Sequence, residues 1–208
     1  MDQQHPSPSR WAIVLAGGEG TRMQPLVHRW LGFNQPKQYC AFVGSRSMFQ
    51  HTVDRAALVT APERIVAVVG RDHRDEILTQ LQGRTIGQVI YQPRNCETAA
   101  GLFLPLTYIH ARAPGATVVI FPSDHFIHPE DRFLAAVCRI AELAETMPDR
   151  LVLLGIRPDR LEMEYGWILP GAALSSQEDA PLCEVHSFME KPNRIQAVKA
   201  FRHGALWN

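Results

Sequence analysis

The sequence predicts an α/β fold of three layers, in which a mainly parallel sheet is covered by helices on both faces. Strand-like and helix-like segments alternate along most of the chain. The strand-like runs, such as Arg64–Val69, are apolar throughout rather than alternately apolar and polar, which is typical of strands buried on both faces. With 208 residues, 46% of them hydrophobic, the chain can bury a sizeable core as one domain.

Short apolar runs rich in β-branched residues are predicted as the strands of this sheet. They are Arg10–Ala16, Arg64–Val69, Val89–Tyr91, Thr117–Phe121 and Leu151–Ile156. Two further strands are predicted after them, Tyr165–Leu169 and Cys183–Phe188, and the polar stretch Ser175–Asp179 lies between them. Because the βα alternation stops before these two strands, we interpret this part of the chain as a substrate-side insertion.

Helical periodicity predicts helices between most of the strands. They are Ser47–Val59, a short helix opened by Asp72, Thr98–Ala111, an amphipathic helix with Pro129 at its first position, and Ile195–Phe201. Ser45 or Ser47 is the candidate N-cap of the earliest helix. Pro105 should kink or shorten Thr98–Ala111, because proline removes a hydrogen bond from a helix interior. The acidic residues Glu130 and Asp131 favour a helix start beside Pro129.

Bulk composition excludes several classes of protein. The 21 basic and 21 acidic residues balance to zero net charge, so no surface for a long nucleic acid is expected. No apolar run approaches the roughly 20 residues of a membrane span. The polar, proline-rich start is unlike a signal peptide and predicts a disordered tail over residues 1–10. The four cysteines lie far apart without a Cys-x-x-Cys pair, which favours a reduced, cytoplasmic protein without a zinc site.

The glycine-rich segment Leu15–Arg22 directly follows the first predicted strand. Glycine has no Cβ atom, so a loop with three glycines lets an anion approach the backbone N–H groups closely. Arg22 and, further along, Lys37 would add fixed positive charge beside the same ligand. The segment therefore predicts a phosphate site, and a nucleoside triphosphate is the ligand that we expect.

The glycine loop matches neither of the two standard nucleotide fingerprints. It does not end in the Gly-Lys-Ser/Thr of a P-loop, and Met23 stands where the dinucleotide fingerprint has its third glycine. A NAD-binding dehydrogenase is disfavoured further, because Gly70 and Arg71 stand at the end of the second strand in place of an acidic residue. For the loop taken alone, an ordinary tight turn is the alternative.

Four polar clusters fall at the carboxyl ends of predicted strands, where open α/β sheets bind their ligands. They are Gly17–Arg22, Gln92–Asn95, Pro122–His125 and Glu190–Pro192. Each is a weak signal alone, since a turn, a solvated aspartate or a surface ion pair would explain it. Because these strand ends share one edge of the predicted sheet, the four clusters together predict a single binding site.

Asp124 is the candidate magnesium ligand. It follows a strongly apolar strand and lies several residues before Pro129, too far away to cap the next helix. Magnesium favours a carboxylate oxygen together with the phosphates of its substrate and retains several waters, so a single carboxylate suits it. His125 is left outside the catalytic set, because a histidine beside such a loop more often packs against it.

The last cluster offers groups for a sugar phosphate. Glu190 could accept hydrogen bonds from sugar hydroxyls, and the Lys191 ammonium could bind a phosphate. Gly166 would let a hexose lie against bare backbone, and a β-bulge is the alternative explanation of a glycine at that position.

Six motifs follow one another along the chain. They are Leu-Ala-Gly-Gly-Glu-Gly-Thr-Arg, Pro-Lys-Gln-Tyr, Pro-Ser-Asp-His, Glu-Tyr-Gly-Trp-Ile, Phe-Met-Glu-Lys-Pro and Leu-Trp-Asn. In this order they resemble the sugar-phosphate nucleotidyltransferases, and the second and third are most similar to mannose-1-phosphate guanylyltransferases. The resemblance covers Trp11 to Asn208. It implies a Rossmann-like, mainly parallel mixed sheet of the nucleotide-diphospho-sugar transferase type.

The resemblance implies that GTP and mannose 1-phosphate give GDP-mannose and pyrophosphate by direct in-line attack, with Mg²⁺ as cofactor. The implied catalytic residues are Arg22, Lys37, Asp124 and Lys191, of which Asp124 would bind the metal. The implied nucleotide-binding residues are Leu15, Ala16, Gly17, Gly18, Gly20, Thr21, Arg22, Gln92, Asn95 and Thr98. The implied sugar-phosphate-binding residues are Gly166, Glu190, Lys191 and Asn208.

The chain also departs from the family pattern. The family has a second metal-binding aspartate beyond the Trp-Asn motif, whereas this sequence stops at Asn208. We therefore expect a nucleotidyltransferase domain over residues 11–208 that is truncated at its C-terminus. The segment Val27–Asn34 is longer than in many nucleotidyltransferases and is expected to form a mobile flap. Asn95–Ala100 replaces the Arg-Asn-Thr-Ala-Pro of guanylyltransferases, so the reaction class is better supported than the base.

Alternatives therefore stay open. The chain could use another base or hexose 1-phosphate, or it could be a non-catalytic homologue that binds nucleotide and acts on a regulatory or protein partner. The sequence also leaves open whether the protein is a homo-oligomer.

Overall fold

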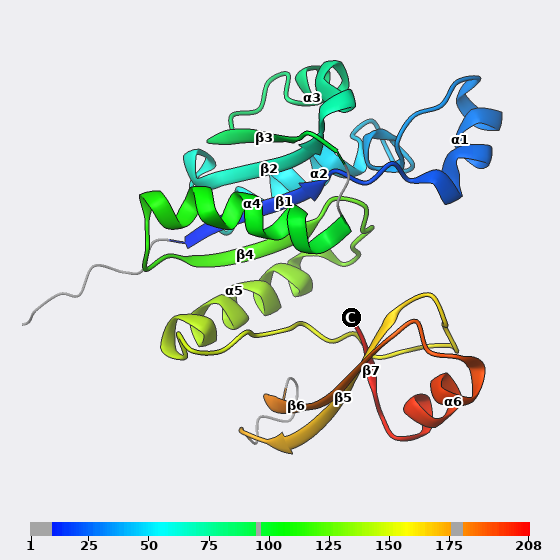
Figure 1. Cartoon of the computed structure of the whole chain (residues 1–208), viewed down its shortest axis with the longest axis vertical. Helices are drawn as coiled ribbons and strands as arrows, with labels where there is room; N and C mark the ends of the chain where they lie inside the picture. Colours follow the sequence, from blue (N-terminus) through cyan, green and yellow to red (C-terminus); the bar gives the residue numbers. More distant parts are fainter. Residues whose placement is uncertain (1–9, 95–96, 176–180) are drawn as a thin grey trace, which may run out of the picture. The chain divides into compact units, whose positions relative to one another are not determined.

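The computed structural model describes residues 10–94, 97–175 and 181–208. The chain divides into two compact units with the boundary between Arg150 and Leu151 (Figure 1). In the part of the chain that is described, the amino-terminal unit contains a parallel sheet with its helices, and the carboxy-terminal unit contains an antiparallel sheet with a single helix.

The sheet of the amino-terminal unit is parallel and has the strand order β3-β2-β1-β4. Its strands are β1 (Arg10–Ala16), β2 (Ile65–Gly70), β3 (Gln88–Gln92) and β4 (Thr117–Pro122). The chain runs outward from β1 through β2 to β3 and then returns to the other side of β1. The winding therefore reverses between β1 and β4, which is the point at which open α/β sheets bind ligands.

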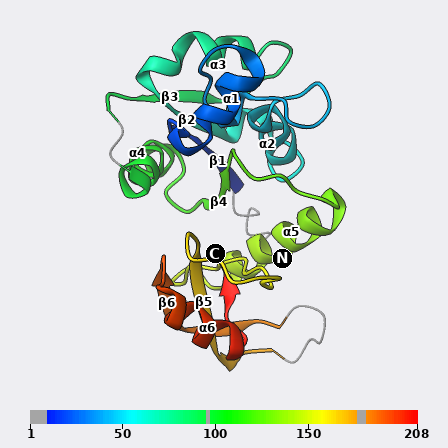
Figure 2. The same ribbon diagram turned by 90° about the vertical axis from the view of Figure 1, so that its right-hand side faces the viewer.

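Helices cover both faces of this sheet, as the prediction required (Figure 2). The helices of the unit are α1 (Gln24–Leu31), α2 (Met48–Ala56), α3 (Arg74–Gln80), α4 (Glu97–Arg112) and α5 (Glu130–Thr146). Side chains from α2, α3 and α5 share one core cluster, and α4 contributes to another on the opposite face. Among the described residues, no helix combines the length and the apolarity needed to cross a membrane.

The central strand β1 explains why the sequence shows no polar alternation. Ala12 and Val14 pack into the cluster on the α2 side, whereas Trp11 and Ile13 pack into the cluster on the α4 side. Successive residues of a strand point to opposite faces, and here both faces are buried in apolar clusters. The three-layer prediction is thereby confirmed.

The helix predictions hold in most places and fail at two prolines. Ser47 is the N-cap of α2 and forms a reciprocal capping box with Gln50. Pro129 is the N-cap of α5 rather than its first residue, because the helix begins at Glu130. The prediction that Pro105 shortens its helix is wrong, since α4 runs through it. Pro105 and Ile109 are both buried, so packing of this face outweighs the roughly 3 kcal/mol that an interior proline costs.

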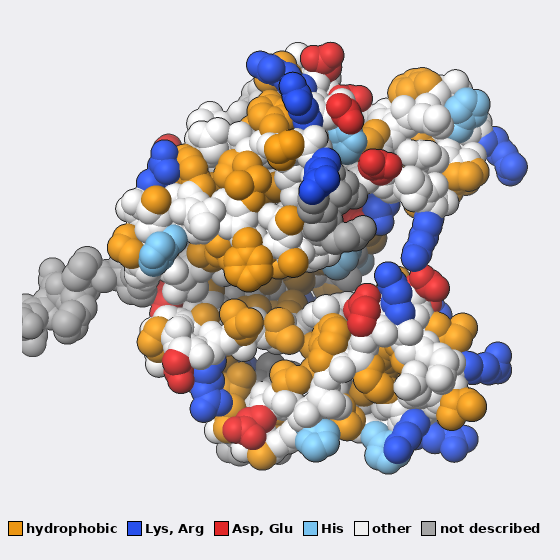
Figure 3. Space-filling view, viewed as in Figure 1, with side chains coloured by type: hydrophobic (Ala, Val, Ile, Leu, Met, Phe, Trp, Pro, Cys, Tyr) orange, Lys and Arg blue, Asp and Glu red, His pale blue; other side chains and the backbone are white. Residues whose placement is uncertain are grey.

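Helix α4 is apolar on its outward side as well. Phe103 is 69% exposed and Leu104 is 41% exposed, and the space-filling view shows apolar side chains over this face of the unit (Figure 3). The helix therefore lacks the clear polar face that marks α5 in the sequence.

The segment predicted as a flap contains a helix. Helix α1 ends at Gly32, whose left-handed backbone (φ 83°) provides the C-cap. Val27 is fully buried, while Trp30 is 52% exposed and stacks on Phe42 with ring centroids 5.7 Å apart. The expected mobility of Val27–Asn34 stays a prediction.

The carboxy-terminal unit contains the antiparallel sheet β6-β5-β7. Its elements are β5 (Gly166–Ala173), β6 (Cys183–Glu190), α6 (Arg194–Arg202) and β7 (Leu206–Trp207). The two strands and the helix predicted here are confirmed. The short strand β7 was not predicted; it pairs Trp207 with Trp167 and completes a core built on two tryptophans.

The predicted strand Leu151–Ile156 is wrong. Only Ile156 forms an isolated bridge, with Trp207, and Leu151 is 95% exposed. The apolar run satisfied the pattern for a buried strand, but a strand also needs a neighbour to pair with along its length, and a sequence pattern does not supply one.

Candidate active site

The glycine loop leaves the carboxyl end of β1 and is closely surrounded on one side. A Cβ atom on Gly17 would stand 2.5 Å from Oε1 of the buried Gln92. Gly20 has a left-handed backbone (φ 62°), and a Cβ atom there would meet Lys37 at 3.2 Å. Gly18 differs, because it is exposed and no atom lies within 4 Å of its missing Cβ. Contacts within the protein therefore require glycine at positions 17 and 20, whereas the backbone at Gly18 is exposed.

Two buried polar side chains, Gln38 and Ser123, hold the glycine loop by hydrogen bonds to its backbone carbonyls. The Gln38 amide donates from Nε2 to the carbonyl oxygens of Ala16 (3.0 Å) and Gly18 (2.7 Å). Ser123, at the end of β4, donates to the Leu15 carbonyl from its backbone N–H (3.1 Å) and from Oγ (2.6 Å). Both side chains are 2% exposed. The carbonyls of Leu15, Ala16 and Gly18 thus accept hydrogen bonds within the protein.

Gln38 and Ser123 were missed as supports of the loop. Each stands beside a residue that was predicted, and no residue pattern distinguishes a glutamine that holds a loop from one that faces solvent.

Lys37 and Asp124 meet at the carboxyl edge of the sheet. Lys37 begins a short 3-10 turn, Lys37–Tyr39, after the glycine loop, and Asp124 follows β4. The Lys37 ammonium lies 2.5 Å from Asp124 Oδ2, with 36% and 30% of the two side chains exposed. The sequence separation of these residues is large, so the ion pair is produced by the parallel pairing of β1 with β4.

The neighbouring residues are held in defined environments. Tyr39, buried under the loop, packs edge-on against His73, and burial raises the pKa of its hydroxyl well above the usual value. His125 Nε2 lies 3.8 Å from Asp124 Oδ1. Desolvation outweighs the attraction of Asp124 and lowers the pKa of His125.

The remaining predicted nucleotide-binding residues lie at the same edge or just beyond it. Thr21 and Arg22 form an exposed 3-10 turn directly after the loop. Gln92 ends β3, and its side-chain amide would lie 2.5 Å from a Cβ atom on Gly17 and 3.4 Å from one on Gly101. Thr98 is exposed in the first turn of α4. Asn95 lies outside the described residues.

The carboxy-terminal unit brings together all four predicted sugar-phosphate-binding residues. Gly166 pairs with Glu190 in the sheet, and its carbonyl accepts a hydrogen bond from the Asn208 N–H at 2.9 Å. A Cβ atom on Gly166 would stand 2.7 Å from Phe188, 3.1 Å from Glu190 Oε2 and 3.2 Å from Asn208 Cβ. The register shifts of β5 lie between Leu169 and Ala173. Close approach, rather than a bulge, therefore accounts for the glycine at position 166.

Lys191 has an unusual backbone. Its φ angle is 45°, the only positive value at a non-glycine residue among those described. Its N–H donates to the Tyr165 carbonyl at 3.2 Å, and its ammonium lies 3.8 Å from Glu190 Oε1. Both charged side chains are more than half exposed. Left-handed backbone costs a non-glycine residue roughly 1 kcal/mol or more, and such residues gather at functional sites.

Among the described residues, no group of three or more His, Cys, Asp or Glu side chains could hold a metal ion by itself. Any metal bound at Asp124 must therefore take most of its ligands from elsewhere.

An open parallel sheet with a glycine loop, a lysine and an aspartate at its carboxyl edge is typical of α/β proteins that bind phosphorylated ligands. The chain belongs to the family described as Nucleotidyl transferase, which it matches over residues 11–207. The resemblance found in the sequence is thereby confirmed, and with it membership of a family of enzymes.

Characterised relatives agree with this assignment. The chain is 34% identical over 199 residues to the xanthan biosynthesis protein XanB of Xanthomonas campestris pv. campestris (strain B100), covering 94% of this chain and 40% of that protein. It is 33% identical over 195 residues to the mannose-1-phosphate guanylyltransferase of Escherichia coli (strain K12), covering 92% and 39%. The chain thus spans about two fifths of the curated relatives that it matches.

A solved structure extends the similarity to the fold. A protein of Thermus thermophilus, described as a mannose-1-phosphate geranyltransferase, superposes with a TM-score of 0.78 at 28% identity. The superposition covers 96% of this chain and 55% of the other.

Proposed function

We propose that the protein transfers a guanylyl group from GTP to mannose 1-phosphate, giving GDP-mannose and pyrophosphate. Family membership supports nucleotidyl transfer, and the relative from Escherichia coli, named for this reaction, supports the choice of substrates. The oxygen of the sugar phosphate attacks the α-phosphorus in line, so catalysis consists of positioning and charge neutralisation.

The observation that carries the proposal is the ion pair between Asp124 and Lys37, together with the close approach of Lys37 to Gly20 of the glycine loop. The loop N–H groups and Arg22 bind the triphosphate, and Lys37 neutralises charge on the reacting phosphates. Gln92 and Thr98 are assigned to the base and ribose, together with Asn95, which lies outside the described residues. Gln92 is buried, which supports its assignment to selection of the base.

The residues present fit a magnesium ion. Mg²⁺ is bound by one or two carboxylates together with substrate phosphates and water, and Asp124 offers one carboxylate that is 30% exposed at the sheet edge. Asp124 would hold the ion, which when bound supplies positive charge to the phosphates of the nucleotide.

The sugar phosphate is assigned to the second cluster. Gly166 presents backbone without a side chain, Glu190 accepts hydrogen bonds from hydroxyl groups, and Asn208 adds an amide beside them. The Lys191 ammonium binds the phosphate, and its fixed left-handed backbone supports a defined direction for the side chain.

A pyrophosphate-release assay tests the proposal. Purified protein is offered each of four nucleoside triphosphates with several hexose 1-phosphates and Mg²⁺, and the expected result is release only when GTP and mannose 1-phosphate are both present. Release with another pair would correct the base or the sugar. Tight GTP binding in calorimetry without any release would instead favour a nucleotide-binding homologue that acts on a partner.

A further inference from the structure

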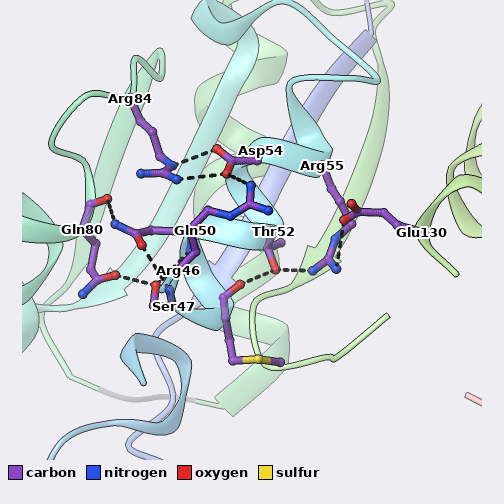
Figure 4. Close-up of polar contacts among 10 residues, drawn as sticks. Arg46, Ser47, Gln50, Thr52, Asp54, Arg55, Gln80, Arg84 and Glu130 are labelled. Carbon is purple, nitrogen blue, oxygen red and sulfur yellow. Dashed lines mark hydrogen bonds and ion pairs between the residues drawn. The ribbon is translucent and has the colours of Figure 1, made fainter. Parts of the chain in front are cut away.

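Arg55 is a buried cation on α2 that no part of the proposed reaction uses. Its side chain is 4% exposed. Nη2 donates to Thr52 Oγ1 at 2.7 Å and to the His125 carbonyl at 3.4 Å, and Nη1 lies 3.6 Å from Glu130 Oε1. The Thr52 hydroxyl gives its own proton to the Met48 carbonyl at 2.9 Å, so its lone pair is available to Arg55 (Figure 4).

Keeping an arginine at this position costs free energy. Burial lowers the pKa of Arg55 even though the attraction of Glu130 opposes the shift. Its Nε has no hydrogen-bond partner among the described residues. An apolar side chain of similar length would fill the same space without desolvating a charge, and such replacements are often neutral or stabilising in other proteins. Core packing alone therefore does not explain the residue.

Arg55 contacts two residues of the segment that carries Asp124, one on its carboxyl side and one at the start of α5. This segment, 123–130, starts at Ser123, which is hydrogen-bonded to β1, and ends at Glu130, the first residue of α5. Arg55 contacts its third residue through a backbone carbonyl and its last residue through a carboxylate. The contact to the His125 carbonyl is a long hydrogen bond of 3.4 Å, and the contact to Glu130 is an ion pair of 3.6 Å, so Arg55 acts on the segment through two contacts together.

We propose that Arg55 is a positioning residue for Asp124. By holding the His125 carbonyl and the first turn of α5, it fixes the backbone from which the Asp124 carboxylate reaches Lys37. The role of Arg55 in the reaction rests on the proposed function of Asp124. Its effect on the conformation of segment 123–130 does not depend on that function.

Asp54, the adjacent residue on α2, provides a matched control. Its carboxylate accepts hydrogen bonds from Arg84 at 2.8 and 3.0 Å and from Arg46 at 2.8 Å. These partners belong to the far side of α2 from Arg55 (Figure 4). Asp54→Asn therefore weakens the anchoring of the same helix without removing a contact to segment 123–130.

Hydrogen–deuterium exchange tests the positioning directly. In Arg55→Met we expect peptides over 123–130 to exchange roughly tenfold faster than in the wild type, and in Asp54→Asn we expect them to exchange at the wild-type rate. Arg55→Lys keeps the charge but offers one nitrogen in place of a planar fork, so it should also exchange faster. It provides the same comparison if the methionine variant does not fold. Equal exchange over 123–130 in the wild type and the folded Arg55 variants, or an equal rise in Asp54→Asn, would overturn the proposal.

Metal dependence tests the link to Asp124. With GTP and mannose 1-phosphate, we expect Arg55→Met to raise the Mg²⁺ concentration for half-maximal rate about tenfold, the size seen when groups that orient a metal ligand are removed. Asp54→Asn should leave it unchanged. An unchanged Mg²⁺ requirement in an active Arg55 variant overturns the link to Asp124. A wild type without any transfer activity refutes the proposed function instead, and the exchange experiment then still decides what Arg55 holds.

Discussion

The two units build their clusters of candidate site residues in different ways. In the amino-terminal unit the site depends on buried polar side chains and on contacts between residues far apart in sequence, such as Ser123 with Leu15. In the carboxy-terminal unit it depends on antiparallel register, which places Gly166 opposite Glu190, and on exposed charges. In the first unit buried side chains hold backbone groups, and in the second unit paired strands present exposed side chains.

This difference indicates which substitutions each unit tolerates. Replacing a buried side chain that holds the glycine loop should lower both stability and activity, because the same atoms contribute to folding and position the site. Changing Glu190 or Lys191 should cost activity with little loss of stability, since exposed ion pairs contribute little to folding.

The largest expected effect comes from Asp124. Asp124→Ala removes the proposed metal ligand and leaves Lys37 without its counter-charge, so we expect turnover to fall by about 10³-fold or more. Pyrophosphate release under saturating GTP, mannose 1-phosphate and Mg²⁺ measures it. Asp149→Ala, at an exposed turn after α5, is the matched control and should keep full activity. Wild-type turnover in the Asp124 variant would show that the assigned role is wrong.

Substitutions at Lys191 should give the next largest loss of activity. Two of them together distinguish the function of the ammonium group from the strain of the backbone. Lys191→Ala and Lys191→Gly both remove the ammonium, and we expect each to lose about 10²-fold in kcat/KM. Only glycine relieves the left-handed backbone (φ 45°), so the glycine variant should be more stable than the alanine variant by about 1 kcal/mol. Urea unfolding gives the stabilities. Equal stability of the two variants would mean that the backbone there carries no strain.

The location of these residues was predictable from the sequence, but their supports were not. The glycine loop and Asp124 were found because each follows an apolar run, and Lys37 was found as a basic residue in the Pro-Lys-Gln sequence after the loop. Gln38 and Arg55 lie in ordinary polar positions, and their importance arises from burial, which depends on the folded chain. The failed strand Leu151–Ile156 and the unpredicted β7 have the same origin, because pairing partners decide whether a short apolar segment forms a strand.

The glycine loop offers a smaller and more selective test. Gly17→Ala would force Gln92 away from a 2.5 Å contact, so we expect a loss of about 1–3 kcal/mol in the free energy of unfolding. Gly18→Ala meets open space and should leave stability within about 0.5 kcal/mol, while weakening GTP binding by narrowing the approach to the backbone. Unfolding curves and calorimetric titration with GTP distinguish the two. Unperturbed GTP affinity in Gly18→Ala would count against the loop as the triphosphate site.

The smallest effect is a pH dependence confined to the amino-terminal unit. Burial tends to raise the pKa of Asp54, but hydrogen bonds from Arg84 and Arg46 outweigh it, and the net pKa is lowered. A carboxylate whose pKa is lower in the folded than in the unfolded state stabilises the fold above the unfolded value of about 3.9, and this contribution is lost as pH falls through the folded value. The difference in stability between wild type and Asp54→Asn should therefore be largest near neutral pH and shrink below about pH 4. Urea unfolding between pH 7 and pH 3 measures it, and a difference that stays constant with pH would contradict the ion-pair assignment. Glu190→Gln should change the free energy of unfolding much less at neutral pH, because its pair with Lys191 is exposed to water.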